Sequence, residues 1–156
     1  MVDLDAIDHS IIDALQEDGR VTNADLAERI GLSASACHRR VRRLETEGVI
    51  ERYAAMVNRD LVGRGVSVFV EISLESQREE LLDEFEAAVL EVAHIQSCHL
   101  MAGMADYLVH VTCKDVADYE TIHRESIAVL PGVTRVRSNF AIRNVTDTTV
   151  LDLQAS

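Results

Sequence analysis

The spacing of the apolar residues changes near residue 65, and this change constrains the fold more than any other feature of the chain. Before it, apolar residues recur every three or four positions, the period of a helix that buries one face. After it, they alternate strictly, the period of a strand with one buried face. The two patterns are carried by Leu4, Ile7, Ile11 and Leu15, and by Val66, Val68, Val70, Ile72 and Leu74.

Three helices are predicted in the first 48 residues. Asn23 and Ser33 are expected to cap the second and third helices, because short polar side chains accept hydrogen bonds from the first backbone N–H groups. The helices are expected to end at Gly19, Gly31 and Gly48. The third helix is expected to face inward through Cys37, Val41 and Leu44. Two helices that meet across Gly31-Leu32-Ser33 indicate a helix-turn-helix, and Val49–Val57 is expected to add a wing of one or two short strands.

The remainder of the chain predicts a second, mixed domain. Residues 58–65 contain two glycines and few apolar side chains, so we expect a hinge there. The segments that follow predict a strand, a helix, two strands, a helix and a strand, with a further short strand over 148–153. The order βαββαβ is that of a ferredoxin-like fold. The predicted class is α+β, with a winged helix-turn-helix domain over 1–57, a hinge over 58–65 and a ferredoxin-like domain over 66–156.

The charge of the chain is unevenly distributed. The net charge is −12, which on its own argues against binding to nucleic acid. However, the segment from Leu32 to Leu44 holds four arginines and no acidic residue. A polyanion responds to the local field of the surface that it meets rather than to the sum over the chain. The only concentrated positive charge therefore lies on the predicted third helix.

The arginines of this helix have two interpretations. Opposite the inward face, Ser35, Arg39 and Arg42 are expected to point outward, with His38 and Arg43 beside them. A basic stripe on the second helix of a helix-turn-helix is typical of a protein that reads the DNA major groove. The alternative is a solvated face that is paired with Glu45, Glu47 and the acids of the second helix. The helix-turn-helix context favours DNA binding.

Other functional classes find little support in the sequence. His94, Cys98, His99, His110, Cys113 and His123 lack the short fixed spacing of metal ligands, and neighbours on a strand point to opposite faces. We therefore expect no metal site, no cofactor and no catalytic residues. An odd number of cysteines argues against a disulfide framework. The acidic N-terminus and the absence of a long apolar run argue against a signal peptide and a membrane span, so the cytoplasm is the expected location.

The turn Ala102–Leu108 has the polar groups that an amino acid requires. Backbone N–H groups near Gly103 are expected to receive a carboxylate, and Asp106 an ammonium group. The alternative is a plain hairpin in which glycine and aspartate serve the turn geometry alone. The sequence physics of the turn favours this alternative.

Several stretches, in order, resemble one family. They are LDAIDHSIIDALQEDGR, LAERIGLS, CHRRVRRLETEGVI, VFVEISL, IQSCHLMAG, DYLV and LPGV. Together they resemble the leucine-responsive regulatory protein and AsnC family of transcriptional regulators, over about residues 4–145. The resemblance implies dimers that pair through their sheets and commonly assemble into octamers. It also implies that an amino acid or similar metabolite binds between dimers, so that residues 66–156 form an effector-binding and oligomerisation domain.

The resemblance also assigns residues to roles. The recognition helix corresponds to Ser33–Glu47, with candidate DNA contacts at Ser33, Ser35, His38, Arg39, Arg42 and Arg43. The effector site corresponds to Leu100, Met101, Gly103, Met104, Asp106 and Tyr107, with Asn139, Phe140 and Ala141 as further candidates. Met104 and Ala105 replace an acid and an aromatic residue that are usual in the family, which favours a more apolar ligand.

The predicted function is a sequence-specific DNA-binding transcriptional regulator, not an enzyme, whose assembly or DNA affinity responds to a small amino acid. Its expected partners are double-stranded DNA, the effector and further copies of the chain, without a membrane. Two alternatives remain at this point: a ligand-independent architectural DNA-binding protein and a metal-dependent sensor or enzyme. A ligand titration and a metal analysis of the purified protein separate them.

Overall fold

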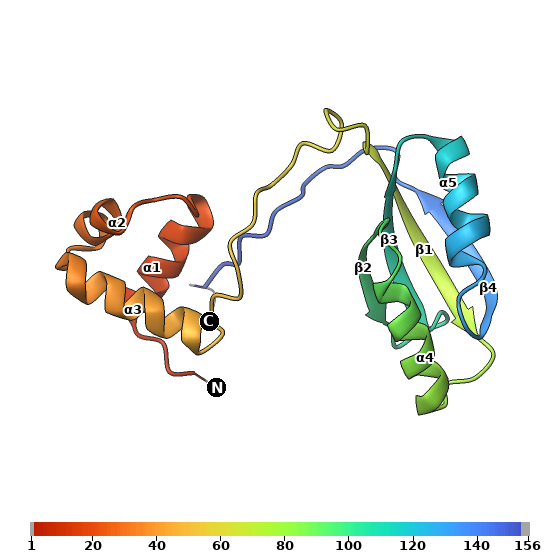
Figure 1. The fold of residues 1–156 in the computed structure, drawn as a ribbon, viewed down its shortest axis with the longest axis horizontal. Coiled ribbons are helices and arrows are strands. Elements are labelled where there is room, and N and C mark those ends of the chain that lie inside the picture. Colours follow the sequence, from red (N-terminus) through yellow and green to blue (C-terminus); the bar gives the residue numbers. More distant parts are fainter. Residues whose placement is uncertain (1, 154–156) are drawn as a thin grey trace. The chain divides into compact units, whose positions relative to one another are not determined.

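The computed structural model describes residues 2–153 and contains two compact units. The first unit comprises Met1–Met56 together with Thr146–Ser156, and the second comprises Val57–Val145. The units correspond to the two ribbon bodies in Figure 1. The boundary after Met56 lies one residue before the end of the predicted first domain. The C-terminal boundary differs more, because the segment after Val145 groups with the first unit rather than with the effector domain.

The first unit consists of three helices around a small apolar core. They are α1 (Ala6–Glu17), α2 (Asn23–Ile30) and α3 (Ala34–Thr46). Its fully buried apolar side chains are Ile11, Ala14, Leu26, Ala27, Cys37 and Leu44. Cys37 and Leu44 are the predicted inward positions of the third helix, and Val41 packs against them. The predicted helical period is confirmed.

The turn between α2 and α3 has the geometry of a helix-turn-helix. Gly31 has φ 76°, a left-handed conformation that glycine adopts without a steric penalty, and it ends α2. The Ser33 hydroxyl accepts a hydrogen bond from the Ala36 N–H and so caps α3. The predicted cap of α2 was wrong by one residue: Thr22 is the N-cap, and its hydroxyl accepts from the Asp25 N–H. Asn23 instead donates from its side chain to the Ala34 carbonyl and joins the two helices.

The residues after α3 form no strand. The N–H groups of Val49 and Ile50 both donate to the Leu44 carbonyl and close the C-terminus of the helix, so they are not available to a sheet. Residues 51–58 then run without regular structure. The strands expected over 49–57 are therefore not observed in this part of the described chain.

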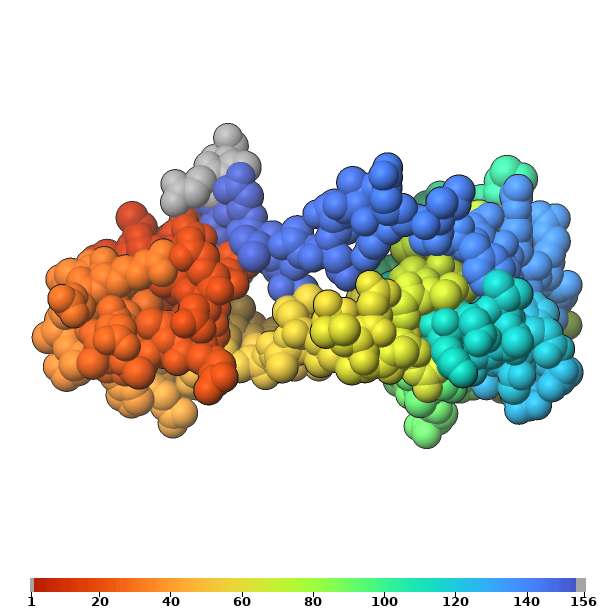
Figure 2. Space-filling model, turned by 90° about the horizontal axis from the view of Figure 1, so that it is seen from above, coloured from red at the N-terminus to blue at the C-terminus, as the bar shows by residue number. Residues whose placement is uncertain are grey.

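The C-terminal segment returns to the first unit. The Gln16 side chain of α1 donates to the Leu151 carbonyl at 3.0 Å and accepts from the Leu151 N–H at 2.7 Å. Figure 2 shows the darkest blue atoms of this segment beside the red atoms of the first unit. The strand expected over 148–153 is absent, because the backbone of Leu151 bonds to a side chain instead of a neighbouring strand.

The second unit has the predicted order βαββαβ. Its elements are β1 (Val66–Leu74), α4 (Glu79–Leu90), β2 (Ile95–Leu100), β3 (Tyr107–Cys113), α5 (Val116–Ile122) with a π-helical turn, η1 (His123–Ile127), and β4 (Val133–Phe140). The sheet order is β2-β3-β1-β4, and each neighbouring pair is antiparallel. This arrangement confirms the predicted ferredoxin-like α+β class.

Helices α4 and α5 cover one face of this sheet (Figure 1). The alternate residues of β1 that face them, Val68, Val70, Ile72 and Leu74, are buried with Phe85 of α4 and with Tyr119 and Ile122 of α5. The opposite face carries Phe69, Glu71 and their register partners His110 and Arg137. No helix of the described second unit covers this opposite face, which we call the open face.

The segment 58–65, expected to be a hinge, contains a hydrogen-bonded turn in the second unit. The Asn58 side chain accepts from the Leu61 N–H, and the Arg64 N–H donates to the Arg59 carbonyl at 2.7 Å. The Arg64 guanidinium lies 3.1 Å from the Asp118 carboxylate at the start of α5. Residues 51–57, which precede this turn, form no helix or strand, and the Tyr53 hydroxyl donates to Glu45 of α3.

Candidate functional site

The outward face of α3 carries the side chains that were predicted to contact DNA. Ser33, Ser35, His38, Arg39 and Arg42 are all exposed. Arg42 is 70% exposed and lies 3.7 Å from Glu45, a loose pair of the kind that adds little stability. The first turn of α3 contains no acidic residue, so the positive end of the helix dipole is not compensated there. This face therefore attracts anions.

Two arginines of the same helix have a different environment. Arg40 donates to both Asp5 and Asp8 of the α1 N-terminus, at 2.8 and 2.9 Å. Arg43 donates to the other carboxylate oxygen of Asp8 at 2.5 Å and lies 3.7 Å from Glu47. The long pairs of Arg42 with Glu45 and of Arg43 with Glu47 are those that the alternative interpretation named. The closer partners, Asp5 and Asp8, lie at the N-terminus of α1 rather than on the second helix. Arg43, a predicted DNA contact, is held against Asp8.

The N-terminus of α1 is arranged to hold these carboxylates. Asp5 and Asp8 form a capping box in which each side chain accepts from the other residue's N–H, at 2.9 and 3.1 Å. Bonds from the Asp8 N–H and from Arg40 stabilise the charged form of Asp5 and lower the pKa of its carboxyl group. Hydrogen bonds to Asp8 and Asp5 raise the pKa of Arg40. Sequence reasoning missed this network, because its partners are 32 and 35 residues apart.

The candidate effector residues of the β2–β3 turn are largely exposed. Leu100, Met101 and Met104 are solvent-accessible, with Met104 93% exposed. Gly103 has no left-handed φ, and a Cβ built at this position meets no atom within 4 Å. The fold itself therefore does not require a glycine here, and the space beside its Cα is open to a ligand.

The Asp106 carboxylate is less available to the ammonium group of a ligand than the sequence suggested. Its carboxylate accepts hydrogen bonds from the Leu74 N–H at 2.7 Å and from the Gln77 side chain at 2.5 Å. These bonds tie the hairpin to the end of β1, which is the structural role given by the alternative interpretation. Tyr107 is buried, and its hydroxyl donates to Glu86 of α4. Burial and the neighbouring Glu86 carboxylate raise the pKa of Tyr107.

The remaining effector candidates lie at the opposite corner of the sheet. Tyr107 pairs with Ile72 near the end of β1, whereas Phe140 pairs with Val68 near its beginning. Four residues of strand separate these positions by ~13 Å, and β1 lies between β3 and β4. The structure thus does not bring Asn139, Phe140 and Ala141 together with the Gly103 turn in one chain.

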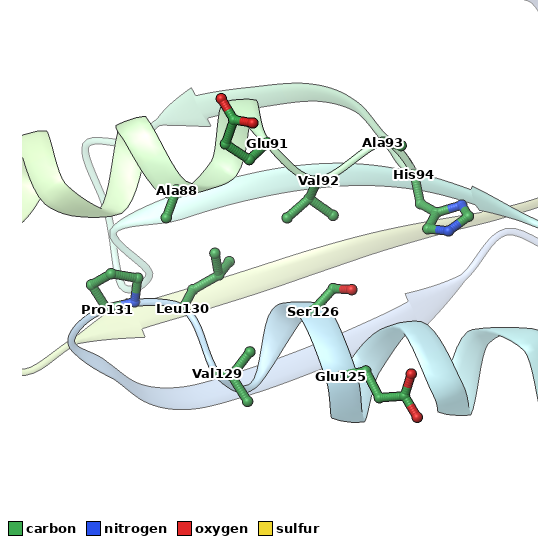
Figure 3. Close-up of a pocket in the computed structure, with 10 residues that line it drawn as sticks. All are labelled: Ala88, Glu91, Val92, Ala93, His94, Glu125, Ser126, Val129, Leu130 and Pro131. Carbon is green, nitrogen blue, oxygen red and sulfur yellow. The ribbon is translucent and has the colours of Figure 1, made fainter.

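A groove on the helix side of the second unit holds none of the predicted site residues. It has a volume of about 400 Å³ and lies between the end of α4, η1 and the loop that follows. Figure 3 shows Ala88, Val92 and Leu130 facing its interior, with Glu91 and Glu125 at its margins. The sequence offered no sign of it, because Ala88 and Val92 fit the spacing of a core helix and Leu130 belongs to the turn after η1.

The histidines and cysteines of the second unit do not form a metal centre. Among the described residues no group of three or more histidine, cysteine or acidic side chains is placed to hold a metal ion. Cys98 packs against the core, and burial raises its thiol pKa to about 11. Over residues 2–153, no helix has both the length and the apolar character needed to cross a bilayer.

Comparison with known proteins identifies the family. Residues 67–151 match the model of the Lrp/AsnC ligand binding domain, and residues 4–51 match that of a winged helix-turn-helix DNA-binding domain. The leucine-responsive regulatory protein of Salmonella typhimurium is 40% identical over 143 residues, 92% of this chain and 87% of that protein. The Bkd operon transcriptional regulator of Pseudomonas aeruginosa is 40% identical over 145 residues, 93% of this chain and 95% of that protein.

Solved structures agree with this assignment. The crystal structure of a transcriptional regulator from Neisseria meningitidis in complex with L-Met superposes with a TM-score of 0.91 and 32% identity. The match covers 97% of this chain and 98% of that one. The resemblance seen in the sequence is thereby confirmed, as is the expectation of a regulator rather than an enzyme. The chain belongs to the Lrp/AsnC family of transcriptional regulators, in which a winged helix-turn-helix DNA-binding domain precedes a ligand-binding domain.

Proposed function

We propose that this regulator binds a specific DNA sequence as a dimer, through the outward face of α3, and that a small amino acid changes its assembly or its DNA affinity. The observation that carries the first part is the row of exposed side chains on α3, where His38, Arg39 and Arg42 follow a first turn that contains no acidic residue. Arginine binds guanine O6 and N7 or a phosphate through two donors. A dimer with two-fold symmetry requires a roughly palindromic site.

Arg39→Ala and Arg42→Ala test the DNA interface. Each substitution is expected to weaken binding by ~1–3 kcal/mol if the arginine contacts a base, and to reduce the salt slope by ~1 if it contacts a phosphate. The measurement is a salt titration of binding to a duplex that the wild-type protein selects from a random library. Unchanged affinity and slope in both variants contradict the assignment of α3 as the DNA-binding helix.

The open face of the sheet supports pairing with a second copy. Phe69 is 39% exposed and stacks on His110 with ring centroids 4.7 Å apart, which gives this face an aromatic centre. Around it, Glu71 lies 3.3 Å from Asn139 and 3.9 Å from Arg137, so the margin carries both signs of charge. A sheet with helices on one side requires cover for such a face. A two-fold partner presents the same patch, which is self-complementary in both charge and apolar surface.

Phe69→Glu tests this pairing in the full chain. A carboxylate in the aromatic centre of the interface is buried without a partner in the dimer, so light scattering should report a monomer. The matched control is Leu90→Glu, which introduces the same charge at an exposed position of α4 and should leave a dimer. A Phe69→Glu variant that remains dimeric shows that the open face is not the interface.

An amino acid is the ligand class that the β2–β3 turn fits best. The open space beside Gly103 allows a carboxylate to approach the backbone N–H groups of the turn. The Asp106 carboxylate has about four acceptor sites, and the Leu74 and Gln77 groups occupy two of them. The other sites are available to an ammonium group. Met104 offers an apolar wall to the side chain of the ligand.

The positions of the two sets of candidate effector residues link ligand binding to the assembly of subunits. Because the Gly103 turn and Asn139–Ala141 lie at opposite corners of one sheet, a single site built from both sets requires two subunits. A ligand that contacts two subunits shifts their association equilibrium. A coupling of ~1–3 kcal/mol changes DNA occupancy several-fold. The relative from Neisseria meningitidis was crystallised with L-Met, which makes L-Met a suitable first probe.

Gly103→Val and Asp106→Asn test the effector site. A Cβ at position 103 meets no atom of the free protein within 4 Å, whereas the valine side chain fills the approach of the carboxylate, so L-Met should no longer raise the melting temperature. Asp106→Asn retains an acceptor for the Leu74 N–H but removes the charge that attracts the ammonium, so the response should weaken. In the wild type, ligand at 100 times its Kd stabilises the fold by ~2.7 kcal/mol.

The unliganded melting temperatures of both variants serve as the control and should stay near that of the wild type. If L-Met raises the melting temperature of Asp106→Asn as much as that of the wild type, the Asp106 carboxylate only stabilises the hairpin and does not bind the ligand. If none of the twenty amino acids alters either stability or DNA binding of the wild type, the chain is an architectural DNA-binding protein instead.

A further inference from the structure

Asp8 is the most deeply buried charged residue described in the first unit, with only 1% of its surface exposed. Burial of a lone carboxylate is strongly unfavourable, so its neighbours must supply cations and hydrogen bonds. Oδ1 accepts from Arg40, and Oδ2 accepts from Arg43 and from the Asp5 N–H. Both cations belong to α3, while the carboxylate belongs to α1. Asp8 therefore joins the two helices through charged, directional bonds.

The geometry of α3 separates its four arginines into two pairs. A helix turns about 100° per residue, so Arg40 points about 100° away from Arg39, and Arg43 about 100° away from Arg42. Arg40 and Arg43 are neighbours on one flank of the helix and meet Asp8. Arg39 and Arg42 are exposed on the outward face. One pair is half-buried against Asp8, while the other faces solvent.

The rest of the α1–α3 contact does not fix the rotation of α3 as closely. Cys37 and Leu44 pack against the apolar core, and apolar contact is non-directional. The two guanidinium groups, in contrast, form hydrogen bonds with a carboxylate that the capping box itself orients. A small rotation of α3 about its axis breaks these bonds and also moves Arg39 and Arg42 relative to a DNA groove.

We infer that Asp8 is a positioning residue for DNA recognition: its buried carboxylate holds Arg40 and Arg43, and so sets the rotation at which α3 presents Arg39 and Arg42 to DNA. This inference rests on the proposed role of α3 as the DNA-binding helix. It removes Arg43 from the candidate DNA contacts. It also means that two of the four positive charges are offset by Asp5 and Asp8 rather than by phosphate.

Asp8→Asn tests the positioning role directly. The amide is nearly the same size and retains one acceptor, but it holds the two arginines less firmly. Affinity for the selected duplex should fall about tenfold, while affinity for a scrambled duplex should not fall, because the variant has lost a negative charge. Partial unfolding lowers both affinities equally, so the ratio of the two distinguishes positioning from stability. Asp3→Asn, at an exposed position near the same end of the unit, removes the same charge and should leave the ratio unchanged.

A series of arginine-to-glutamine variants provides the second measurement, which applies even if Asp8→Asn folds poorly. Arg40→Gln and Arg43→Gln retain a donor to Asp8 and should lower affinity for the selected duplex without changing the salt slope. Arg39→Gln or Arg42→Gln should reduce that slope by ~1 wherever the arginine contacts a phosphate. Circular dichroism confirms that each variant is helical at the temperature of the titration.

Each outcome either supports or overturns the positioning role of Asp8. A lower ratio in Asp8→Asn, with unchanged slopes in Arg40→Gln and Arg43→Gln, supports the positioning role. An unchanged ratio in folded Asp8→Asn, or a slope reduced by ~1 in Arg43→Gln, overturns it while leaving the proposed function intact. Unchanged affinity and slope in both Arg39→Gln and Arg42→Gln overturn the proposed function, and the positioning role fails with it.

Discussion

A carboxylate that is almost excluded from water determines how the first unit presents its DNA-binding surface. Transfer of such a charge out of water costs several kcal/mol unless cations and N–H groups surround it. Asp8 meets this requirement with Arg40, Arg43 and the N–H of Asp5, and these bonds attach α3 to the beginning of α1. The net charge of −12 is therefore compatible with DNA binding, because the exposed cations Arg39 and Arg42 remain on one outward face.

In the second unit, the single layer of helices constrains the structure, because it covers only one face of the sheet. α4 and α5 bury one face of the sheet and leave Phe69 and His110 at the centre of the other. The candidate effector residues then lie at opposite corners of the sheet, near Gly103 and near Phe140. In the proposed function, pairing of the open face and completion of the effector site both require further copies of the chain. This dependence gives a physical reason why ligand binding and assembly are coupled in the proposed mechanism.

The sequence predicted those features that depend on the spacing of apolar residues within one element and on the residues that end a helix. The alternation from Val66 to Leu74 and the glycine after Ile30 identified β1 and the helix-turn-helix turn, and both are observed. It did not predict contacts between distant segments. Asp8 accepts a hydrogen bond from Arg43, which is 35 residues away in the chain, and Asp106 accepts one from Leu74, which is 32 residues away. The local spacing of residues indicates neither pair. The expected strand over 148–153 failed for the same reason, since Leu151 bonds to Gln16 across 135 residues.

The most direct test of the account is a crystal structure of the full chain bound to a DNA duplex that it selects. The account predicts that α3 lies in the major groove, with Arg39 and Arg42 within hydrogen-bonding distance of bases or phosphates. It also predicts that Arg40 and Arg43 still donate to Asp8 in the complex. A complex in which Arg43 has left Asp8 to contact a phosphate, or in which α3 does not touch the DNA, contradicts it.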